Sequence, residues 1–541
     1  MKIKSIYRKA SLCLICAMSF VCKEKFFAQK NESKKPNIIY IMSDDHGYQA
    51  ISAYNGKLNK TPNIDRIAKE GAIFKNSFVT NSLCAPSRAV MLTGKHSFVN
   101  GKVDNVQPFN WDQQTFPKLL QNAGYQTALV GKIHLKGQPQ GFDYSAVLPG
   151  QGQYYNPDFI INNKKQQIHG YVTDITTDLA LKWLKNRDAD KPFCLLFHQK
   201  APHREWLPPK RYYEEYVKKE FPEPATLFDD FSNRGTAAKA AEMNILKHQN
   251  WAGDSKLPPE VMDELGLSES ISWDKEAYIN NLGRMDAKQR KSWDSVYNPI
   301  VEDFKRKYPS MTQKELMHWR YERFMQDYLA CVAAVDDGVG DVLDYLKANG
   351  LEENTIVVYT SDQGFYLGEH GWFDKRFMYE ESFRTPLMVK YPKEIKPGTV
   401  VDEMVQNIDY APTFLDYAGV KIPNNIQGKS LRPILKGEHP KWRDALYYTY
   451  YEYPSIHMVK RHYGIRTKRY KLIHFYYDID EWELYDLKKD PHELNNLYGN
   501  PKYDNIIKDR KKKLQKLRAE YGDSEANDDR FLKEYLDATQ K

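Results

Sequence analysis

The chain has 541 residues, of which 41% are hydrophobic and 28% are charged. This composition is typical of globular proteins and excludes global disorder. The length accommodates one large domain and a smaller one, each with its own core. The net charge of +8 is modest and spread along the chain. Because no compact basic stripe or nucleic-acid-binding module is present, we expect no nucleic acid as partner.

Residues 1–28 have the pattern of a signal peptide. Residues 1–9 are basic without an acid, and residues 10–22 form an apolar run as long as a signal-peptide core. Cleavage after Ala28 is the simplest interpretation, and lipidation of Cys22 is the alternative. Either one predicts a periplasmic or secreted protein. No later segment has the ~20 apolar residues that a transmembrane span requires.

The cysteines do not indicate a disulfide framework. Three of the six lie in the predicted export segment. The mature chain retains Cys84, Cys194 and Cys331, or these three and a lipid-bearing Cys22, too few for the framework of a small disulfide-rich secreted protein.

Two patterns of buried strands each end in a polar cluster. Residues 38–42 (Ile-Ile-Tyr-Ile-Met) precede Ser-Asp-Asp-His-Gly, and residues 355–360 precede Ser-Asp-Gln-Gly. Helical patterns occur at residues 63–70, 116–123, 174–185 and 321–348. This alternation predicts an α/β fold whose central sheet is mostly parallel. In such sheets ligands collect beyond the carboxyl ends of the strands, where both clusters lie.

A change in composition and strand pattern divides the mature chain into two parts. We expect a catalytic domain at residues 36–440, in which residues 204–320 form an insertion covering one face of the sheet. Aromatic-rich strand patterns follow at 445–453, 463–467 and 470–477, with a helix at 505–521. They predict a smaller subdomain with an antiparallel sheet at residues 441–521. Residues 522–541 are expected to be a charged, peripheral tail.

The most specific local signal is residues 82–94, Ser-Leu-Cys-Ala-Pro-Ser-Arg-Ala-Val-Met-Leu-Thr-Gly. A cysteine followed by Pro, Ser, Arg and an apolar helical run indicates a residue at a helix N-terminus. There the free N–H groups and the helix dipole favour negative charge. Arg88 adds a cation one turn later. This setting predicts a lowered pKa for the Cys84 thiol and affinity for an anionic ligand.

The same segment resembles the signature of formylglycine-dependent sulfatases, Cys-x-Pro-Ser-Arg followed by a Thr-Gly turn. Residues 124–134, Gly-Tyr-Gln-Thr-Ala-Leu-Val-Gly-Lys-Ile-His, resemble the second signature of that family. The order of blocks is similar from Pro36 to about Tyr498. The resemblance implies an alkaline-phosphatase-like fold, with a mixed, mostly parallel sheet flanked by helices. It also implies that a separate formylglycine-generating enzyme oxidises Cys84 to formylglycine (3-oxoalanine).

Three carboxylates at two strand ends predict a metal site. Asp44, Asp45 and Asp362 converge there, with the amide oxygen of Gln363 beside them. Converging anions repel unless a hard cation lies among them, and an all-oxygen set suits Ca²⁺ better than Zn²⁺. The resemblance assigns these four residues, with the residue derived from Cys84, as calcium ligands. Better-known members more often have Asn or His where this chain has Gln363.

The resemblance also selects cations and histidines for the reaction. Arg88, Lys132 and Lys375 are implied to neutralise sulfate oxygens. In the mechanism that the resemblance implies, a hydroxyl of the hydrated formylglycine attacks sulfur while His203 protonates the departing sugar oxygen. His134 is then expected to act as the base that allows sulfate to leave.

The expected substrate is a sulfated oligosaccharide. Residues 365–376 and 478–486 combine carboxylates, histidine and tryptophan, which hydrogen-bond to sugars and stack on them. The candidates for sugar contacts are His370, Trp372 and Glu483. With residues 149–158 and 198–203, these blocks resemble bacterial polysaccharide sulfatases, and most of all the N-acetylglucosamine-6-sulfatases. Glycosaminoglycan 6-O-sulfate and an algal polysaccharide such as ulvan are both left open, as are exo or endo action and the oligomeric state.

Two other classes of protein share features of this sequence. A phosphodiesterase or phosphonate monoester hydrolase of the alkaline phosphatase superfamily would have the same fold and a related metal site. A two-zinc phosphatase should have more histidines grouped with the aspartates. A non-catalytic sugar-binding relative should lack the intact block around Cys84.

Overall fold

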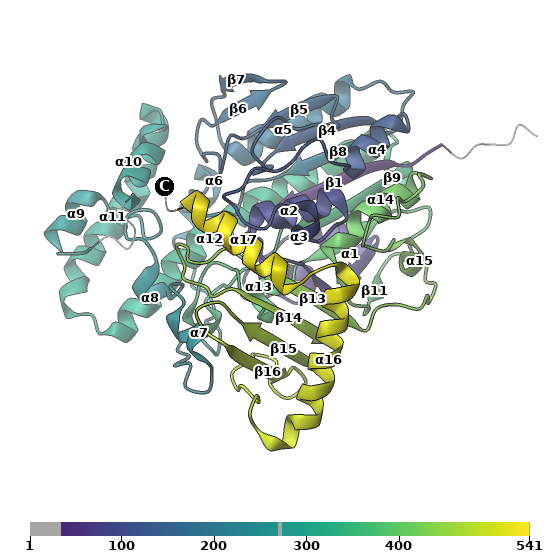
Figure 1. Ribbon diagram of the computed structural model, residues 1–541. Helices are drawn as coiled ribbons and strands as arrows, with labels where there is room; N and C mark the ends of the chain where they lie inside the picture. The colour runs from purple at the N-terminus through teal and green to yellow at the C-terminus, as the bar shows by residue number, and fades with distance from the viewer. Residues whose placement is uncertain (1–33, 269–272, 540–541) are drawn as a thin grey trace, which may run out of the picture. The chain divides into compact units, whose positions relative to one another are not determined.

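The structure is a computed structural model that describes residues 34–268 and 273–539 (Figure 1). The predicted signal peptide, with Cys22 and Ala28, therefore lies outside the described residues. The residues from Pro36 onward belong to one unit. In the portion that the structure describes, no helix combines the length and the apolar character needed to cross a membrane.

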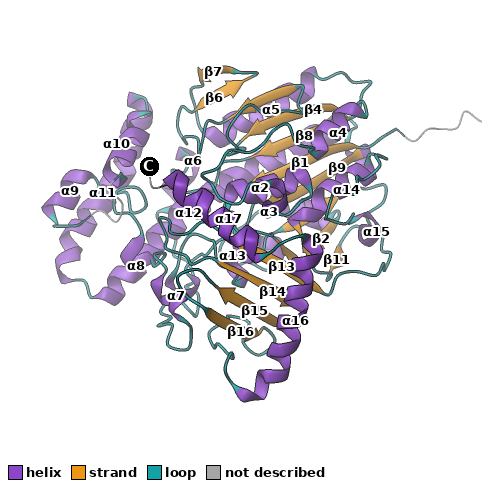
Figure 2. Ribbon diagram, in the orientation of Figure 1, coloured by secondary structure: helices purple, strands orange, loops and turns teal. Residues whose placement is uncertain are grey.

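A ten-stranded sheet organises the unit (Figure 2). Its strands are β1 (Asn37–Ser43), β2 (Ala72–Phe74), β4 (Gln126–Gly131), β5 (Tyr144–Val147), β6 (Asp158–Ile161), β7 (Lys164–Gln167), β8 (Phe193–His198), β9 (Thr355–Ser361), β10 (Leu387–Lys390) and β11 (Thr399–Val401). Their order is β11-β2-β10-β9-β1-β8-β4-β5-β6-β7. The central strands β9, β1, β8, β4 and β5 pair in parallel, whereas β10, β6 and β7 pair antiparallel. The predicted mixed, mostly parallel sheet is confirmed.

Helices pack on both faces of this sheet because successive residues of a strand point to opposite sides. Ile39 and Ile41 of β1 pack in one core, and Ile38 and Tyr40 pack in another. The first core includes α1 (Pro62–Lys69), α5 (Val172–Asn186) and α12 (Gln313–Ala348). The second includes α2 (Cys84–Thr93), α4 (Phe116–Asn122), α14 (Tyr410–Tyr417) and α15 (Arg432–Leu435).

Helix α12 is longer than its sequence pattern predicts. The apolar pattern suggests a start near residue 321, but the helix begins at Gln313. Thr312 and Glu315 form a capping box at this earlier start, in which each side chain bonds to the backbone of the other residue. The cap satisfies the first N–H groups and fixes the helix end eight residues earlier.

Residues 204–320 contain six helices in the ranges that the structure describes. They are α6 (Lys210–Tyr216), α7 (Thr236–Ala240), α8 (Ile245–His248), α9 (Pro259–Glu264), α10 (Asp274–Gly283) and α11 (Ala287–Lys307). Helices α6 and α8 pack against α12, which itself lies on the sheet. Helices α6 and α8 are thus connected to that face of the sheet through α12.

The C-terminal part contains the predicted small antiparallel sheet. Its strands, in spatial order, are β13 (Ala445–Tyr450), β14 (His462–Thr467), β15 (Tyr470–Phe475) and β16 (Glu481–Asp486). Helix α16 (Asp504–Tyr521) packs on this sheet in a core of its own. Short elements elsewhere are β3 (Ser77–Phe78), β12 (Val405–Gln406), α3 (Ser97–Asn100) and α13 (Glu380–Phe383).

The prediction of a peripheral tail at residues 522–541 is wrong. Residues 525–539 form helix α17 (Glu525–Thr539). Its Phe531 and Tyr535 are buried, and the hydroxyl of Tyr535 donates a hydrogen bond to the carbonyl of Pro454 (2.9 Å). The sequence prediction missed these two buried residues because the segment as a whole is rich in charged residues.

Candidate active site

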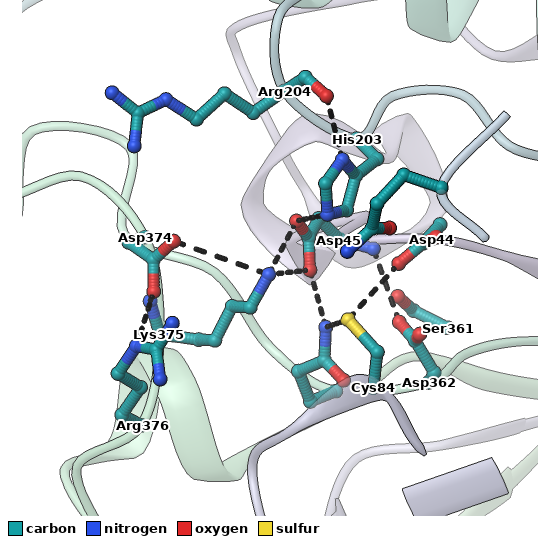
Figure 3. Close-up of polar contacts among 12 residues, drawn as sticks. Asp44, Asp45, Cys84, His203, Arg204, Ser361, Asp362, Asp374, Lys375 and Arg376 are labelled. Carbon is teal, nitrogen blue, oxygen red and sulfur yellow. Dashed lines mark hydrogen bonds and ion pairs between the residues drawn. The ribbon is translucent and has the colours of Figure 1, made fainter. Parts of the chain in front are cut away.

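The polar clusters that follow β1 and β9 meet at the start of helix α2 (Figure 3). Ser43 pairs with Ser361 across the two parallel strands, so the residues that follow emerge at the same edge of the sheet. Asp44 follows β1, and Cys84 is the first residue of α2. The Sγ atom of Cys84 lies 3.4 Å from Oδ1 of Asp44.

Asp44, Asp45 and Asp362 form a buried carboxylate cluster. Their ligand atoms all lie within 4.8 Å of one another. Burial, together with Asp44, raises the pKa of Asp362 to about 7. The buried Gln363 amide donates from its Nε2 to Asp45, and its Oε1 has no hydrogen-bond partner. Converging carboxylates repel one another unless a cation lies among them, and a flip of this amide would turn its oxygen toward them, so this set of donors can hold a metal ion.

Each carboxylate of this cluster also has a cationic partner. Lys375 Nζ donates to both oxygens of Asp45 (2.7 Å each), and Arg88 Nε donates to Oδ2 of Asp362 (3.0 Å). Lys132 pairs with Asp44. The structure therefore brings all three predicted cations to the cluster, where they also can pair with an anionic ligand.

The predicted lowering of the Cys84 pKa is wrong. Burial, reinforced by the charge of Asp44, raises the pKa of the thiol well above its ordinary value. Cys84 does lie at a helix N-terminus, but Arg88 is already paired with Asp362 and Asp44. A buried, protonated thiol is a poor nucleophile. An unmodified cysteine is therefore poorly suited to react at this position.

The two predicted histidines lie near the cluster in different settings. His203 Nδ1 donates to the carbonyl of Arg204 (2.6 Å), and its Nε2 lies 3.7 Å from Oδ2 of Asp45. His134 follows β4 in a left-handed conformation, and its buried Nδ1 has no hydrogen-bond partner. Burial, followed by the charge of Lys132, lowers the pKa of both imidazoles well below the ordinary value. Both rings are therefore neutral near neutral pH.

A cavity of about 400 Å³ opens beside Cys84. His203 and Lys375 line it with Cys84, whereas His134 and Lys132 are not among its lining residues. Sequence reasoning did not select several other residues of the lining. They include Asn105, Gln151, Lys200, Arg204, Asp374, Arg376, Glu452 and His457.

A network of four of these residues forms one polar wall of the cavity, which we call the polar wall. Arg376 Nε bonds to Asp374 (3.0 Å), and its NH1 bonds to Glu452 (2.9 Å). His457 Nε2 lies 3.3 Å from Oδ2 of Asp374. Although burial opposes it, the charges of His457, Lys375 and Arg376 hold the pKa of Asp374 well below its usual range. These fixed donors and acceptors suit a ligand rich in hydroxyl groups.

Part of the polar wall could have been found from sequence. Asp374 and Arg376 flank Lys375, just as Lys200 and Arg204 lie near His203. Glu452 has no such signal. It comes from the loop after β13, which only the tertiary fold brings beside residues 374–376.

The three predicted sugar-contacting residues do not line this cavity, which corrects their selection. His370, Trp372 and Glu483 are each at most 1% exposed. His370 Nδ1 contacts Asp229 (2.9 Å), and Glu483 accepts a hydrogen bond from Tyr379 (2.6 Å). The ring of Trp372 stacks among three aromatic side chains. We call these three residues the aromatic core cluster, because they hold the residue 229–235 segment against the small sheet.

Comparisons with known proteins identify relatives over most of the chain. Residues 36–420 match the family described as sulfatase, and residues 368–520 match the family described as N-sulphoglucosamine sulphohydrolase, C-terminal. An N-acetylglucosamine-6-O-sulfatase of Bacteroides thetaiotaomicron is 50% identical over 92% of this chain and 89% of its own. An ulvan-active sulfatase of Formosa agariphila is 27% identical over 99% of this chain and 91% of its own.

A solved structure is similar over the same extent. It has a TM-score of 0.87 and 50% sequence identity, and the match covers 91% of this chain and 99% of that chain. That protein was determined in complex with its substrate, D-glucosamine-2-N,6-O-disulfate.

Proposed function

The chain belongs to the sulfatase family, and we propose that it removes the 6-O-sulfate from glucosamine residues of glycosaminoglycans. As a sulfuric ester hydrolase with an alkaline-phosphatase-like fold, it hydrolyses sulfate esters of carbohydrates and releases inorganic sulfate. The observation that supports the sugar assignment is the 50% identity, over about nine tenths of the chain, to a relative described by this activity.

We propose that Cys84 is the precursor of the nucleophile. Its place at the start of α2, against the carboxylate cluster, favours a modified residue because burial leaves the thiol protonated. Formylglycine at this position supplies, when hydrated, a hydroxyl that can attack sulfur. A formylglycine-generating enzyme is the expected maturation partner. Export to the periplasm or to the medium is part of the same proposal.

Asp44, Asp45, Asp362 and Gln363 would hold the metal, which we propose to be Ca²⁺. The three carboxylates supply oxygen donors, and the Gln363 amide, whose Nε2 now contacts Asp45, would supply its oxygen after a flip. This set fits a hard cation. When bound, Ca²⁺ supplies Lewis-acid stabilisation of negative charge on the sulfate group and the nucleophile.

The chain's own cations and histidines divide the remaining work. Arg88, Lys132 and Lys375 stabilise the charge of the sulfate oxygens. His203 is oriented by the Arg204 carbonyl, so its Nε2 is directed to the cluster and is the atom that would carry the proton to the departing sugar oxygen. An anionic ester near this ring raises the pKa of His203, which makes protonation easier when substrate is bound. His134, with its unpartnered Nδ1, would accept a proton before sulfate leaves.

Glycosaminoglycans are a better-supported substrate than ulvan. The ulvan-active relative is 27% identical, about half the identity of the glucosamine-6-sulfatase relative. A panel of substrates tests this choice directly. The mature enzyme should release sulfate from N-acetylglucosamine 6-sulfate and from 6-O-sulfated heparin oligosaccharides, but far more slowly from ulvan oligosaccharides and from a phosphate monoester.

Faster sulfate release from ulvan oligosaccharides than from the glucosamine 6-sulfates would contradict the proposed substrate. Faster hydrolysis of the phosphate monoester than of any sulfate ester would contradict the proposed reaction. Mass spectrometry of the peptide that contains residue 84 provides the matched control. Conversion to formylglycine must be present in the preparation for a negative assay to count.

A further inference from the structure

Two exposed apolar side chains line the catalytic cavity. Trp273 is 44% exposed and Ile456 is 40% exposed, and both belong to the lining that includes Cys84. Across residues 34–268 and 273–539, they are two of only seven large hydrophobic side chains with such exposure. Exposed apolar groups beside a ligand cavity are typical of contact with the ligand.

Trp273 differs from the other nine tryptophans of the chain. Each of those nine either contacts another aromatic ring or donates its indole N–H to a backbone oxygen. For Trp273 no aromatic, cationic or indole hydrogen-bond partner is found in the portion of the chain that the structure describes. Within the described residues, this indole therefore lacks the ring and hydrogen-bond contacts that hold the other nine.

Both side chains are held by a buried neighbour in the sequence. Asp274 is fully buried, and its carboxylate accepts the backbone N–H groups of residues 252 and 253 (2.9 and 2.8 Å). His457 is buried, and its Nδ1 donates to a backbone carbonyl (2.9 Å). Trp273 and Ile456 are thus presented to the cavity by anchored backbone, which limits the entropy cost of binding a ligand.

Exposure within the lining shows which end of the cavity these residues occupy. Cys84 is 1% exposed and Asp374 is 5% exposed, whereas Trp273 is 44% exposed. The apolar pair therefore lies toward solvent, and the sulfate ester must reach the buried end. Asp374 belongs to the polar wall and is already placed to bond with hydroxyl groups of the sulfated sugar.

We propose that Trp273 and Ile456 form a subsite for the sugar that is joined to the sulfated glucosamine. A sugar ring presents C–H groups on its faces and hydroxyls at its edge, so it can stack on an indole and keep its hydrogen bonds to water. The enzyme then prefers an oligosaccharide to the free monosaccharide. This inference rests on the proposed function and names the part of the substrate that the sulfate assay alone does not reveal.

The test compares three variants on three substrates. The variants are Trp273→Ala, Trp273→Phe and, as a matched control, Ile279→Ala, which removes a 57% exposed side chain outside the cavity lining from helix α10, the helix that Trp273 immediately precedes. The substrates are N-acetylglucosamine 6-sulfate and two heparin-derived disaccharides, with the 6-sulfated glucosamine at the non-reducing or at the reducing end. For each pair, kcat/KM is measured with mature, formylglycine-containing enzyme.

Trp273→Ala should lower kcat/KM about three- to tenfold for at least one disaccharide and leave the monosaccharide within about twofold. Trp273→Phe should recover most of this loss, and Ile279→Ala should change none of the three values. An equal loss on all substrates, or no loss on either disaccharide, would overturn the subsite. If the wild-type enzyme turned over none of the substrates, the proposed function would fail instead, so the two failures are distinguishable.

Discussion

The polar wall lines the cavity beside Cys84, the carboxylate cluster lies next to Cys84 outside that lining, and the two regions arise from the sequence in different ways. Asp44, Asp45 and Asp362 directly follow two apolar strands, so their meeting point is fixed by the sheet. The polar wall joins Asp374 and Arg376 to Glu452, which comes from the small C-terminal sheet region. The difference teaches that the groups proposed for the reaction are encoded locally, whereas those proposed for the substrate depend on packing between distant segments.

The strongest way to separate the two regions is to remove the proposed nucleophile. Cys84→Ala should abolish turnover of every sulfate ester, by about 10⁴-fold or more, because no other group can replace the nucleophile. Cys194→Ala, in β8, is the matched control, since Cys194 is also fully buried but lies outside the cavity lining. Single-turnover sulfate release measures both. Substantial release by Cys84→Ala would refute the assignment of the reaction to this cluster.

Removal of the metal should inactivate the enzyme and leave the repulsion among the three carboxylates of the cluster uncompensated. In the metal-free protein the pKa of Asp362 is about 7, well above its unfolded value of ~4. The contribution of this pKa difference to the free energy of unfolding is fully present below pH ~4, where the carboxyl group is protonated in the folded and the unfolded state. It is lost as the pH rises toward 7.

The free energy of unfolding of the chelated protein should therefore fall between pH 4 and 7, by on the order of 3 kcal/mol for Asp362 alone. Urea unfolding with and without Ca²⁺ measures this change. Asp362→Asn should reduce it but not remove it, because burial also raises the pKa of Asp45 to about 6. A pH-independent stability of the chelated wild type, or inactivation that Ca²⁺ fails to reverse, would contradict a calcium-binding cluster.

The polar wall should affect substrate choice more than the reaction. Glu452→Ala removes a partner of Arg376 (2.9 Å) without touching the carboxylate cluster. We expect kcat/KM for N-acetylglucosamine 6-sulfate to fall roughly 10- to 100-fold, because a buried charged hydrogen-bond network is disturbed. Turnover of 4-nitrophenyl sulfate, which lacks the sugar hydroxyls, should stay within about threefold. Equal losses on both esters would show that the polar wall contributes to the reaction itself. The proposed difference in role between the polar wall and the carboxylate cluster would then be wrong.

Sequence reasoning brought the proposed reaction groups together because strand ends and helix starts are local features. Asp44 follows an apolar run, and Cys84 begins a helix marked by Pro86 and Ser87. It failed on the direction of the Cys84 pKa shift because burial of the thiol, reinforced by the charge of Asp44 3.4 Å away, is a tertiary effect. Composition also misled, since histidine and tryptophan suit sugars but pack equally well in a core, as Trp372 does.

We expect the smallest effect on catalysis from a substitution in the aromatic core cluster. Such a substitution tests whether residue type alone can identify a sugar-contacting side chain. Trp372 is 1% exposed and stacks on Phe377, so Trp372→Phe should leave a partly filled site in the core. We expect the free energy of unfolding to fall by about 1–3 kcal/mol. The value of kcat/KM on glucosamine 6-sulfates should stay within about twofold, because the residue does not line the cavity. A fall in kcat/KM with unchanged stability would contradict this expectation. It would show that Trp372 contributes to sugar binding, as its residue type suggested, despite its burial.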